Sequence, residues 1–377
     1  MGIGGEYPAG STACAESTGE LKKGSRNLWF IMFTNTMIDW VSPRTQVASS
    51  RNDISLTLDT QGFVIGAFVP YVVAAACHNA HYGTIWRTSL GIGVVFPLVL
   101  FVLRLRLKEP EEFTRNSMKY AKTPYMLVLR FYGWRLLVVS LIWFIYDFSA
   151  YSFGIYSSTI IANIYDSKTA PLTTVFGWNT VINLFYIPGT MLGAPLSDYL
   201  GPRYALALGV TLQAVVGFIM AGDYANLSKP GMVGGFAVVY GIFLALGELG
   251  PGNNIGLIAA KTCATGVRGR YYGIAAAVGK IGAFVGTWVF PHIVAAGGDS
   301  DTLKAQYPFY VSSSLCVLSA ALALFCLPHI GQDTITFEDA RFRAYLESHG
   351  YDTRQLGLKK GESLDTIEAV GAGETKA

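Results

Sequence analysis

Long apolar runs recur along almost the whole chain, and they restrict its fold more than any other feature. A helix needs about 20 mainly apolar residues to cross a bilayer. An incomplete run opens the chain, an interrupted run follows it, and complete runs bring the total to nine. The complete runs cover residues 85–103, 135–161, 172–196, 204–222, 232–258, 271–295 and 307–328. The sequence therefore predicts an all-α, polytopic membrane protein.

Composition supports this class and excludes several others. Hydrophobic residues make up 51% of the chain and charged residues only 14%, whereas ordinary soluble domains carry about 25% charged residues. The formal net charge of +3, without a basic run interleaved with aromatics, gives no reason to expect a nucleic-acid partner. The five cysteines and five histidines are scattered, so we expect no disulfide framework and no metal site. No hydrolase constellation of Ser, His and Asp is present, and we expect neither an enzyme nor a cofactor.

The distribution of Lys and Arg predicts the orientation and the domains, because short cytoplasmic loops carry an excess of both. One alternating set of loops holds fifteen of these residues and the other set holds four, so the first set and the tail are expected to face the cytoplasm. A charged stretch separates two groups of apolar runs. We predict an incomplete N-terminal bundle over 1–107, a cytoplasmic linker over 108–134, a C-terminal six-helix bundle over 135–331 and a cytoplasmic tail over 332–377 with one short helix.

Two features suggest that the natural transcript differs from this sequence. Met1 is followed by GIGGEYPAGSTACAES, which is typical of the middle of a helix and has no signal-peptide pattern. The second run is split into residues 28–40 and 62–76, each too short to span, by the polar residues 41–61. Removing 41–61 joins the halves, and its codons can supply intron boundaries and a branch sequence. We hypothesise a retained in-frame intron; a genuine re-entrant or extramembrane loop is the alternative.

Ionisable side chains inside apolar runs are costly and are therefore candidates for function. Trp143, Asp147 and Tyr151 are spaced i, i+4, i+8 and share one helix face, which predicts a proton-titratable, ligand-facing stripe. Lys280 lies in IAAAVGKIGAFVG, where its ammonium needs an acid or an anionic substrate as partner. Asp147 and Lys280 together predict an anion site whose cation the carboxylate neutralises when the site is empty.

Two further acids lie among helix-breaking residues, a pattern found where helices unwind around a site. Glu6 occurs in GGEYPAG, and from the residues alone a role in packing is as well supported as a role in function. Glu248 occurs in GELGPGNNIG, beside Asn253 and Asn254, whose amides can donate hydrogen bonds to substrate hydroxyls.

The connection at residues 194–203, APLSDYLGPR, has the residues of a tight turn between two spans. Asp198 can cap the following helix, bond Arg203 or bond a neighbouring helix end, and Gly201 allows the turn. We interpret Asp198, Gly201 and Arg203 as a gating or structural loop.

Taken together, these motifs resemble the major facilitator superfamily. APLSDYLGPR is similar to the signature that this superfamily places between the second and third helices of each six-helix half. GIGGEYPAGSTACAES, the stripe at Trp143, Asp147 and Tyr151, and GKIGA at Lys280 resemble the fourth-helix, seventh-helix and eleventh-helix motifs of its phosphate:proton symporter branch. GPGNNIGLIAAKTCATGVRGRYYG resembles most the fungal glycerophosphoinositol permeases and related glycerophosphodiester carriers.

The resemblance implies a twelve-span fold of which this chain contains about nine, with a truncated N-terminal bundle lacking the first three spans. It also implies a proton-coupled symporter of glycerophosphodiesters, monomeric and in the plasma membrane, whose partners are a small phosphate-containing anion, protons and the lipid bilayer. An inorganic phosphate symporter and a non-transporting sensor or inactive fragment are the alternatives. The implied residues are Tyr7, Trp143, Asp147, Tyr151, Asn253, Asn254 and Lys280 for substrate binding, and Glu6, Asp147 and Glu248 for proton coupling.

The first prediction concerns the transcript. We expect it to extend upstream of the Met1 codon and to lack codons 41–61, because the chain begins with a mid-helix pattern and the insert splits one span. Sequencing of ribosome-bound RNA tests this. Uninterrupted coverage of codons 41–61, together with a stop codon just upstream of Met1, would contradict it.

Overall fold

The computed structural model describes residues 11–12, 14–15, 24–32, 34, 62–94, 98, 118, 121–164, 171–229, 231–331 and 333–356. Within these ranges every regular element is a helix, which confirms the all-α prediction. Five of the described helical segments are long and apolar enough to cross a membrane. Glu6, Tyr7 and the hypothesised intron at 41–61 lie outside the described residues.

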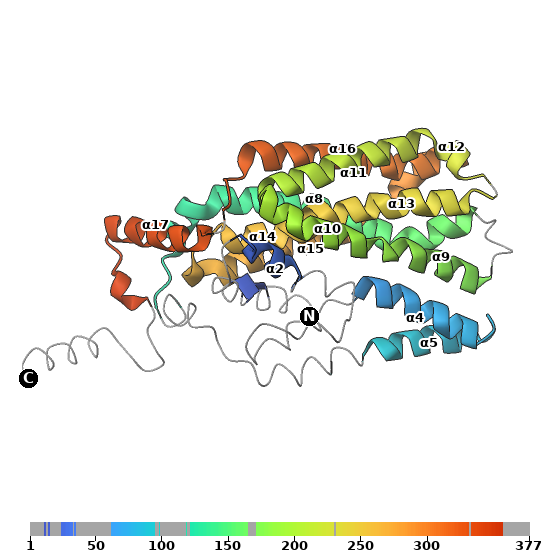
Figure 1. Ribbon diagram of the computed structural model, residues 1–377, viewed down its shortest axis with the longest axis horizontal. Helices are drawn as coiled ribbons and strands as arrows, with labels where there is room; N and C mark the ends of the chain where they lie inside the picture. The colour runs from blue at the N-terminus through green and yellow to red at the C-terminus, as the bar shows by residue number, and fades with distance from the viewer. Residues whose placement is uncertain are drawn as a thin grey trace, which may run out of the picture.

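The six apolar runs predicted after residue 134 all form helices, which pack into one bundle (Figure 1). The first of them starts at Tyr125, inside the range predicted as linker, because the early residues Phe131 and Tyr132 pack against the tail of the chain. The helices are α8 (Tyr125–Ile164), α9 (Leu172–Leu184), α10 (Tyr186–Tyr199), α11 (Pro202–Gly222), α13 (Val233–Gly247), η4 (Glu248–Gly252), α14 (Asn253–Lys261), α15 (Thr265–Ala295) and α16 (Asp301–Cys326).

Two of the spans are interrupted, and each interruption has a proline beside it. Pro188 has no N–H to donate to the carbonyl of Leu184, and the helix is broken at Phe185 between α9 and α10. Pro251 lies inside η4, a π-helical turn between α13 and α14. Turns of this kind frequently occur at functional sites, and this one begins with the predicted acid Glu248.

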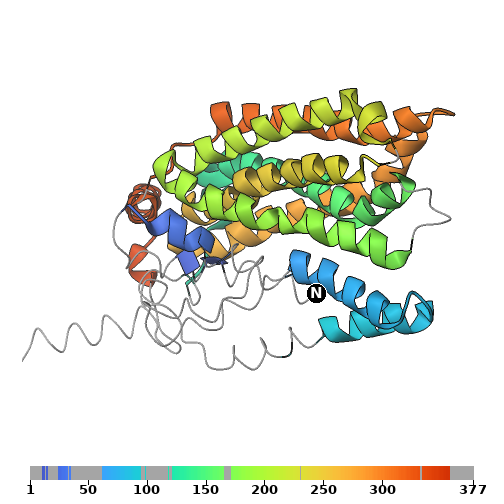
Figure 2. The same cartoon turned by 45° about the vertical axis from the view of Figure 1, so that its right-hand side comes forward.

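Three described helices precede the bundle, namely α2 (Arg26–Ile31), α4 (Gly62–Ala76) and α5 (Tyr82–Gly93). Figures 1 and 2 both place α4 between α5 and α9. Thr180 Oγ1 on α9 donates a hydrogen bond to the carbonyl of Ala67 on α4 over 3.1 Å. Beyond α4, Asn79 Oδ1 accepts from the backbone N–H of Thr173 at the start of α9 over 2.9 Å. The two halves of the predicted fold therefore contact each other along α4 and α9.

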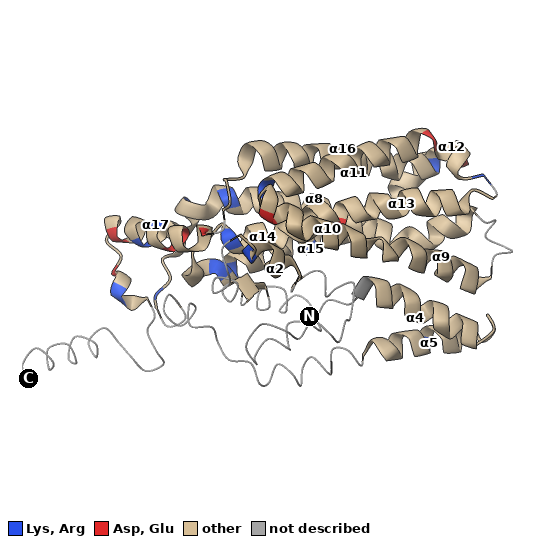
Figure 3. Cartoon of the chain, in the orientation of Figure 1, with Lys and Arg blue, Asp and Glu red and all other residues tan. Residues whose placement is uncertain are grey.

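Most described charges gather at one end of the bundle, where α2, α17 (Thr334–Ser348) and the junction of α14 with α15 lie (Figure 3). We call this the charged end. Short helices complete the described chain, α12 (Tyr224–Leu227) at the opposite end and η5 (Thr353–Gln355) after α17. Helix α17 is the short helix predicted in the tail; its Phe342 and Leu346 are buried, whereas its Phe337 is 73% exposed.

Helix α17 is held to the bundle by ion pairing and capping. Arg135 Nη1 on α8 lies 2.9 Å from Glu338 Oε1 on α17. Asp339 accepts hydrogen bonds from the backbone N–H and the side-chain hydroxyl of Thr265, over 2.6 and 2.7 Å, and so caps the first turn of α15. These contacts tie the tail to the two helices that carry the predicted anion site.

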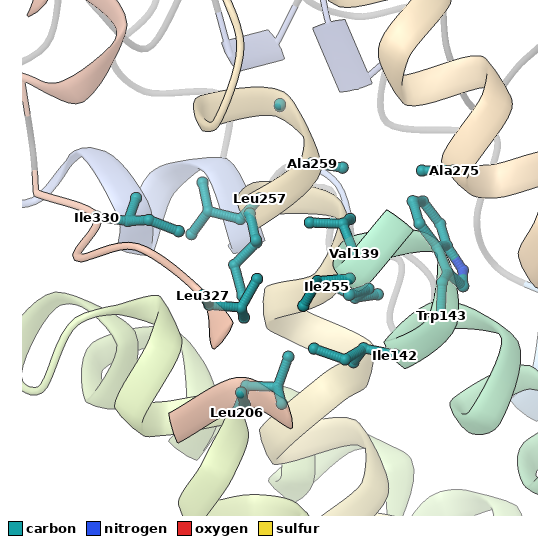
Figure 4. Close-up of a cluster of buried hydrophobic side chains, with 14 of the residues drawn as sticks. Val139, Ile142, Trp143, Leu206, Ile255, Leu257, Ala259, Ala275, Leu327 and Ile330 are labelled. Carbon is teal, nitrogen blue, oxygen red and sulfur yellow. The ribbon is translucent and has the colours of Figure 1, made fainter. Parts of the chain in front are cut away.

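The core behind that site is built from small and branched side chains of several helices (Figure 4). Ile142 and Trp143 of α8 pack with Leu206 of α11 and Ile255 of α14, and all four are at most 3% exposed. Cys14 and Ala15, from the segment near the start of the chain, belong to the same cluster. Residues from both ends of the sequence therefore meet around Trp143.

Helices α8 and α15 approach each other through glycines. A side chain at Gly282 would collide with the backbone of Phe144, and one at Gly286 would collide with the backbone of Phe148. Gly279 faces the ring of Trp143 in the same way. These glycines bring the backbones of the two helices together at the predicted anion site.

We predict that Gly282→Ala destabilises the protein by about 1–3 kcal/mol, because its methyl group would press on packed backbone. Gly269→Ala on the same helix is the matched control, since a Cβ there meets no atom within 4 Å. It should stabilise the protein by up to about 1 kcal/mol. Unfolding in detergent measures both. Equal effects of the two variants would contradict the assigned contact.

Candidate functional site

The structure brings three of the predicted site residues together between α8 and α15. Lys280 Nζ lies 3.0 Å from Asp147 Oδ2 and donates a hydrogen bond to Tyr151 Oη over 2.5 Å. The same nitrogen lies 4.2 Å from the centre of the Tyr151 ring, so the ring also makes a cation–π contact. Asp147 and Tyr151 reach the ammonium together because they are one helical turn apart on α8.

The carboxylate and the ammonium of this group differ in exposure. The side chain of Asp147 is 3% exposed and that of Lys280 is 32% exposed. Among the described residues, the hydrogen bond that Asp147 accepts goes to its Oδ2. An anion can therefore approach the ammonium while the carboxylate stays inside the helix pair.

Trp143, the third member of the predicted stripe, has a different environment. Its ring packs on Gly279 and meets the ring of Tyr272 edge to face, with centroids 5.3 Å apart. Only 3% of Trp143 is exposed. Tyr272 in turn hydrogen-bonds to Ser11. The described contacts therefore place Trp143 in the wall behind the ion pair, where the beginning of the chain meets α15.

The predicted acid Glu248 is 5% exposed and lies at the first position of η4. Tyr146 Oη donates a hydrogen bond to Glu248 Oε2 over 3.2 Å. Tyr146 precedes Asp147 on α8, so one of these adjacent residues contacts the buried acid Glu248 and the other is itself a buried acid. The sequence pattern did not single out Tyr146, because it lies off the helix face that carries Asp147. The one feature of the sequence that could have indicated it is its position next to this acid.

Asn253 and Asn254 are fully buried, and their amides bond to the protein itself. Asn253 Nδ2 donates to the carbonyl of Thr190 on α10 over 3.2 Å. Asn254 Nδ2 donates to the carbonyl of Gly250 over 2.8 Å and its Oδ1 accepts from Ser197 Oγ over 2.7 Å. The bonds to Thr190 and Ser197 connect α14 to α10. Contact of the two amides with a substrate stays a prediction.

The predicted loop lies at the charged end and joins it to α2. Asp198 accepts hydrogen bonds from the backbone N–H groups of Asn27 and Leu28, over 3.0 and 2.9 Å, and so caps α2. Of the three partners considered for Asp198, the structure selects the neighbouring helix end, where its negative charge meets the positive end of the helix dipole. Gly201 has a φ of +86°, as a tight turn requires, and Arg203 donates to the carbonyl of Leu324 on α16.

A second contact beside this cap involves residues that sequence analysis did not select. Lys261, at the end of α14, is 1% exposed, and its Nζ donates to Asn27 Oδ1 over 2.5 Å. Arg26 lies 2.6 Å from Asp333 near the start of α17. Lys261 had been counted among the loop cations, and only the fold reveals that it is buried against α2. The charged end is thus a junction between α2 and the six-helix bundle.

This arrangement of apolar helices, a buried ion pair and a polar junction between two helix groups is that of a polytopic membrane protein. Residues 108–339 match the family of sugar (and other) transporters, and the chain belongs to this family of the major facilitator superfamily. The proton:xylose symporter XylE, in its complex with 6-bromo-6-deoxy-D-glucose, superposes with a TM-score of 0.61 at 13% identity, over 87% of this chain and 70% of that one. The predicted major facilitator fold is therefore confirmed.

Curated relatives extend the comparison. The glycerophosphocholine permease GIT4 of Candida albicans is 48% identical over 95% of this chain and 63% of its own length. The major glycerophosphoinositol permease GIT3 of the same organism is 47% identical over 95% of this chain and 63% of its own length. The glycerophosphoinositol transporter 1 of Saccharomyces cerevisiae is 29% identical over 98% of this chain and 65% of its own length. The chain thus spans somewhat less than two thirds of the length of these relatives.

We predict that Asn27→Ala lowers the free energy of unfolding by about 3 kcal/mol, because it leaves the Lys261 ammonium buried without its amide partner. In a Lys261→Met background the same change should cost less than about 1 kcal/mol, since no charge then needs the amide. A double-mutant cycle measured by unfolding in detergent tests this. An equal cost in both backgrounds would contradict the assigned contact.

Proposed function

We propose that the protein is a proton-coupled symporter of glycerophosphodiesters in the plasma membrane, acting as a monomer. The observation that carries the proposal is the ammonium of Lys280, paired with the enclosed carboxylate of Asp147 and still accessible. Relatives with 47–48% identity are named as glycerophosphocholine and glycerophosphoinositol permeases, which supports the choice of substrate.

The charges of the site favour a phosphodiester over inorganic phosphate. A phosphodiester carries one negative charge, which one ammonium can balance. Inorganic phosphate takes a second charge over much of the physiological pH range, and among the described residues the ammonium of Lys280 is the one cation placed at this pair. Unbalanced charge is costly away from water. Tyr151 adds a hydroxyl beside Lys280 that can donate to a phosphate oxygen.

Coupling to protons follows from the same balance of charge. In the empty site the ammonium of Lys280 is balanced by ionised Asp147; in the loaded site it is balanced by the substrate, and Asp147 holds a proton. Loading without protonation would leave an unpaired negative charge, and protonation without loading would leave an unpaired ammonium, both expensive within the bilayer. The two favourable states therefore differ by one substrate and one proton together.

Glu248 and Glu6 are proposed as further acids in proton coupling. Glu248 is buried and bonded to Tyr146, one residue from Asp147, so a proton on one acid affects the electrostatic energy of the other. Movement of the two helix groups around the site would then expose it to each side in turn. Asp198, Gly201 and Arg203 are proposed to act at the charged end, where the cap on α2 forms and breaks.

A symporter of inorganic phosphate remains the alternative, as does a protein that senses its ligand or does not transport at all. Uptake by the protein encoded by the natural transcript, in cells deprived of their own carriers, distinguishes these functions. Labelled glycerophosphoinositol should enter, and inorganic phosphate at equal concentration should not displace it. Binding without uptake would favour a sensor.

We predict that Lys280→Ala reduces substrate binding by about 100-fold, since loss of a buried, hydrogen-bonded charge costs about 2–5 kcal/mol. Asp147→Asn should keep binding but lose accumulation against a gradient, because the amide cannot carry the coupled proton. Lys304→Ala is the matched control, since it removes another lysine paired with an aspartate, on α16, where that aspartate is 98% exposed.

Binding and uptake measured between about pH 5 and 7.5 separate the two roles. Binding that survives Lys280→Ala would show that the anion binds elsewhere. Uphill accumulation by Asp147→Asn with an unaltered pH profile would move proton coupling to Glu6 or Glu248.

A further inference from the structure

A second polar group lies between α8 and α9, outside every contact described for the ion pair. Ser157 Oγ on α8 donates to Asn179 Oδ1 on α9 over 2.6 Å. One turn along α9, Asn183 Nδ2 donates to the Asn179 carbonyl over 2.7 Å and lies 3.4 Å from Asn179 Oδ1. We call Ser157, Asn179 and Asn183 the amide cluster. It is uncharged and lies on α8 and α9, which belong to the apolar runs predicted over 135–161 and 172–196.

Two amide groups of this cluster have no partner among the described residues. Asn179 Oδ1 takes the hydrogen bonds from Ser157 and Asn183, so Asn179 Nδ2 points away from both and donates to no described residue. Asn183 is 8% exposed, and its Oδ1 accepts from no described residue. Asn179 is only partly buried, and neither Asn179 Nδ2 nor Asn183 Oδ1 is among the fully enclosed side-chain atoms without a partner. A donor and an acceptor are therefore available on neighbouring turns of α9.

The cluster lies beside the contact between the two halves of the fold. Thr180, the residue after Asn179, donates to Ala67 on α4. A Cβ at Gly177 would touch the ring of Tyr71 on the same helix, at 3.4 Å. Around the axis of α9, Asn179 and Asn183 each lie less than a third of a turn from Thr180. They therefore flank the boundary between halves, where carriers of this architecture bind their substrates.

Along α8, the cluster begins fewer than two helical turns from the residue that contacts Lys280. Tyr151, which contacts Lys280, and Ser157 are six residues apart on α8, a rise of about 9 Å along the helix. Phosphodiesters with an organic group on each ester oxygen extend over such a distance, and inorganic phosphate does not. The position and chemistry of the cluster thus suit the part of the substrate that inorganic phosphate lacks.

From these observations we infer that Asn179 and Asn183 form a subsite for the hydroxyl groups of a phosphodiester bound at Lys280. Asn179 Nδ2 donates to one hydroxyl oxygen, and Asn183 Oδ1 accepts from one hydroxyl group. The inference rests on the proposed function and adds to it the part of the substrate that is recognised. The hydroxyls belong either to the glycerol or to the second ester group, and both sources share this chemistry.

The test compares Asn179→Leu with the unaltered protein encoded by the natural transcript. KM for labelled glycerophosphoinositol should rise about 10-fold or more, because buried sites that lose a hydrogen bond to a substrate hydroxyl discriminate strongly. Inhibition by inorganic phosphate in large excess should be the same for both proteins, since phosphate does not reach α9. Asn226→Leu is the matched control, an exposed asparagine in the short helix α12.

Glycerophosphocholine identifies the source of the hydroxyls. An equal loss for both diesters assigns the subsite to glycerol, and a loss for glycerophosphoinositol alone assigns it to inositol; both outcomes support the subsite. The subsite would be overturned if KM stayed unchanged for both diesters, or if inhibition by phosphate weakened by the same factor as the affinity for the diesters. If the unaltered protein takes up neither diester, the proposed function fails and the subsite fails with it.

A measurement on the unaltered protein covers the case in which Asn179→Leu does not fold. Dimethyl phosphate is a phosphodiester without hydroxyl groups. It should compete with glycerophosphoinositol at least 10-fold less well than glycerophosphocholine does, by the same loss of hydrogen bonds. Equal competition by dimethyl phosphate would overturn the subsite while leaving the site at Lys280 intact. Asn183→Leu should reproduce the effect of Asn179→Leu.

Discussion

The ion pair between Lys280 and Asp147 is the constraint on which the rest of the structure depends. An ammonium between membrane-spanning helices is tolerated only with an opposite charge close by. The carboxylate lies 3.0 Å away because three glycines on α15 allow α8 to pack closely against it. The core around Trp143 holds the two helices from behind, and Asp339 on α17 caps the start of α15. Helix packing therefore sets the chemistry of the pair.

The same helices connect this pair to contacts at both ends of the molecule. At the charged end, Asp198 and Lys261 form hydrogen bonds to α2. Toward the other end, Asn79 after α4 bonds to Thr173 of α9, and Ala67 on α4 bonds to Thr180 of α9. The described contacts between the two halves thus lie on both sides of the ion pair. Alternating access requires that one set opens while the other persists. Besides these hydrogen bonds, each set includes apolar packing: Phe30 and Ile31 of α2 belong to the core around Trp143, and Val73 and Ala74 of α4 pack with Leu172 and Phe176 of α9.

Much of this could be predicted from local sequence, and the remainder could not for physical reasons. Apolar length predicted the spans, and the spacing of Asp147 and Tyr151 placed both on one face, because helical periodicity is a local property. The burial of Lys261, its bond to Asn27 and the bond from Tyr146 to Glu248 depend on how distant helices pack. Asn253 was selected for its amide, yet that amide bonds Thr190. Residue type shows what a side chain can do, whereas packing decides which partner it meets.

The central claim is that a bound phosphodiester replaces the Asp147 carboxylate as the partner of Lys280 while that carboxylate takes up a proton. Proton uptake during binding tests it most directly. The purified protein, in weakly buffered detergent solution near pH 7, is mixed with glycerophosphoinositol, and the change in pH is compared with the substrate bound. The account predicts one proton per substrate for the unaltered protein and none for Asp147→Asn. Stoichiometric binding by the unaltered protein without proton uptake would contradict it.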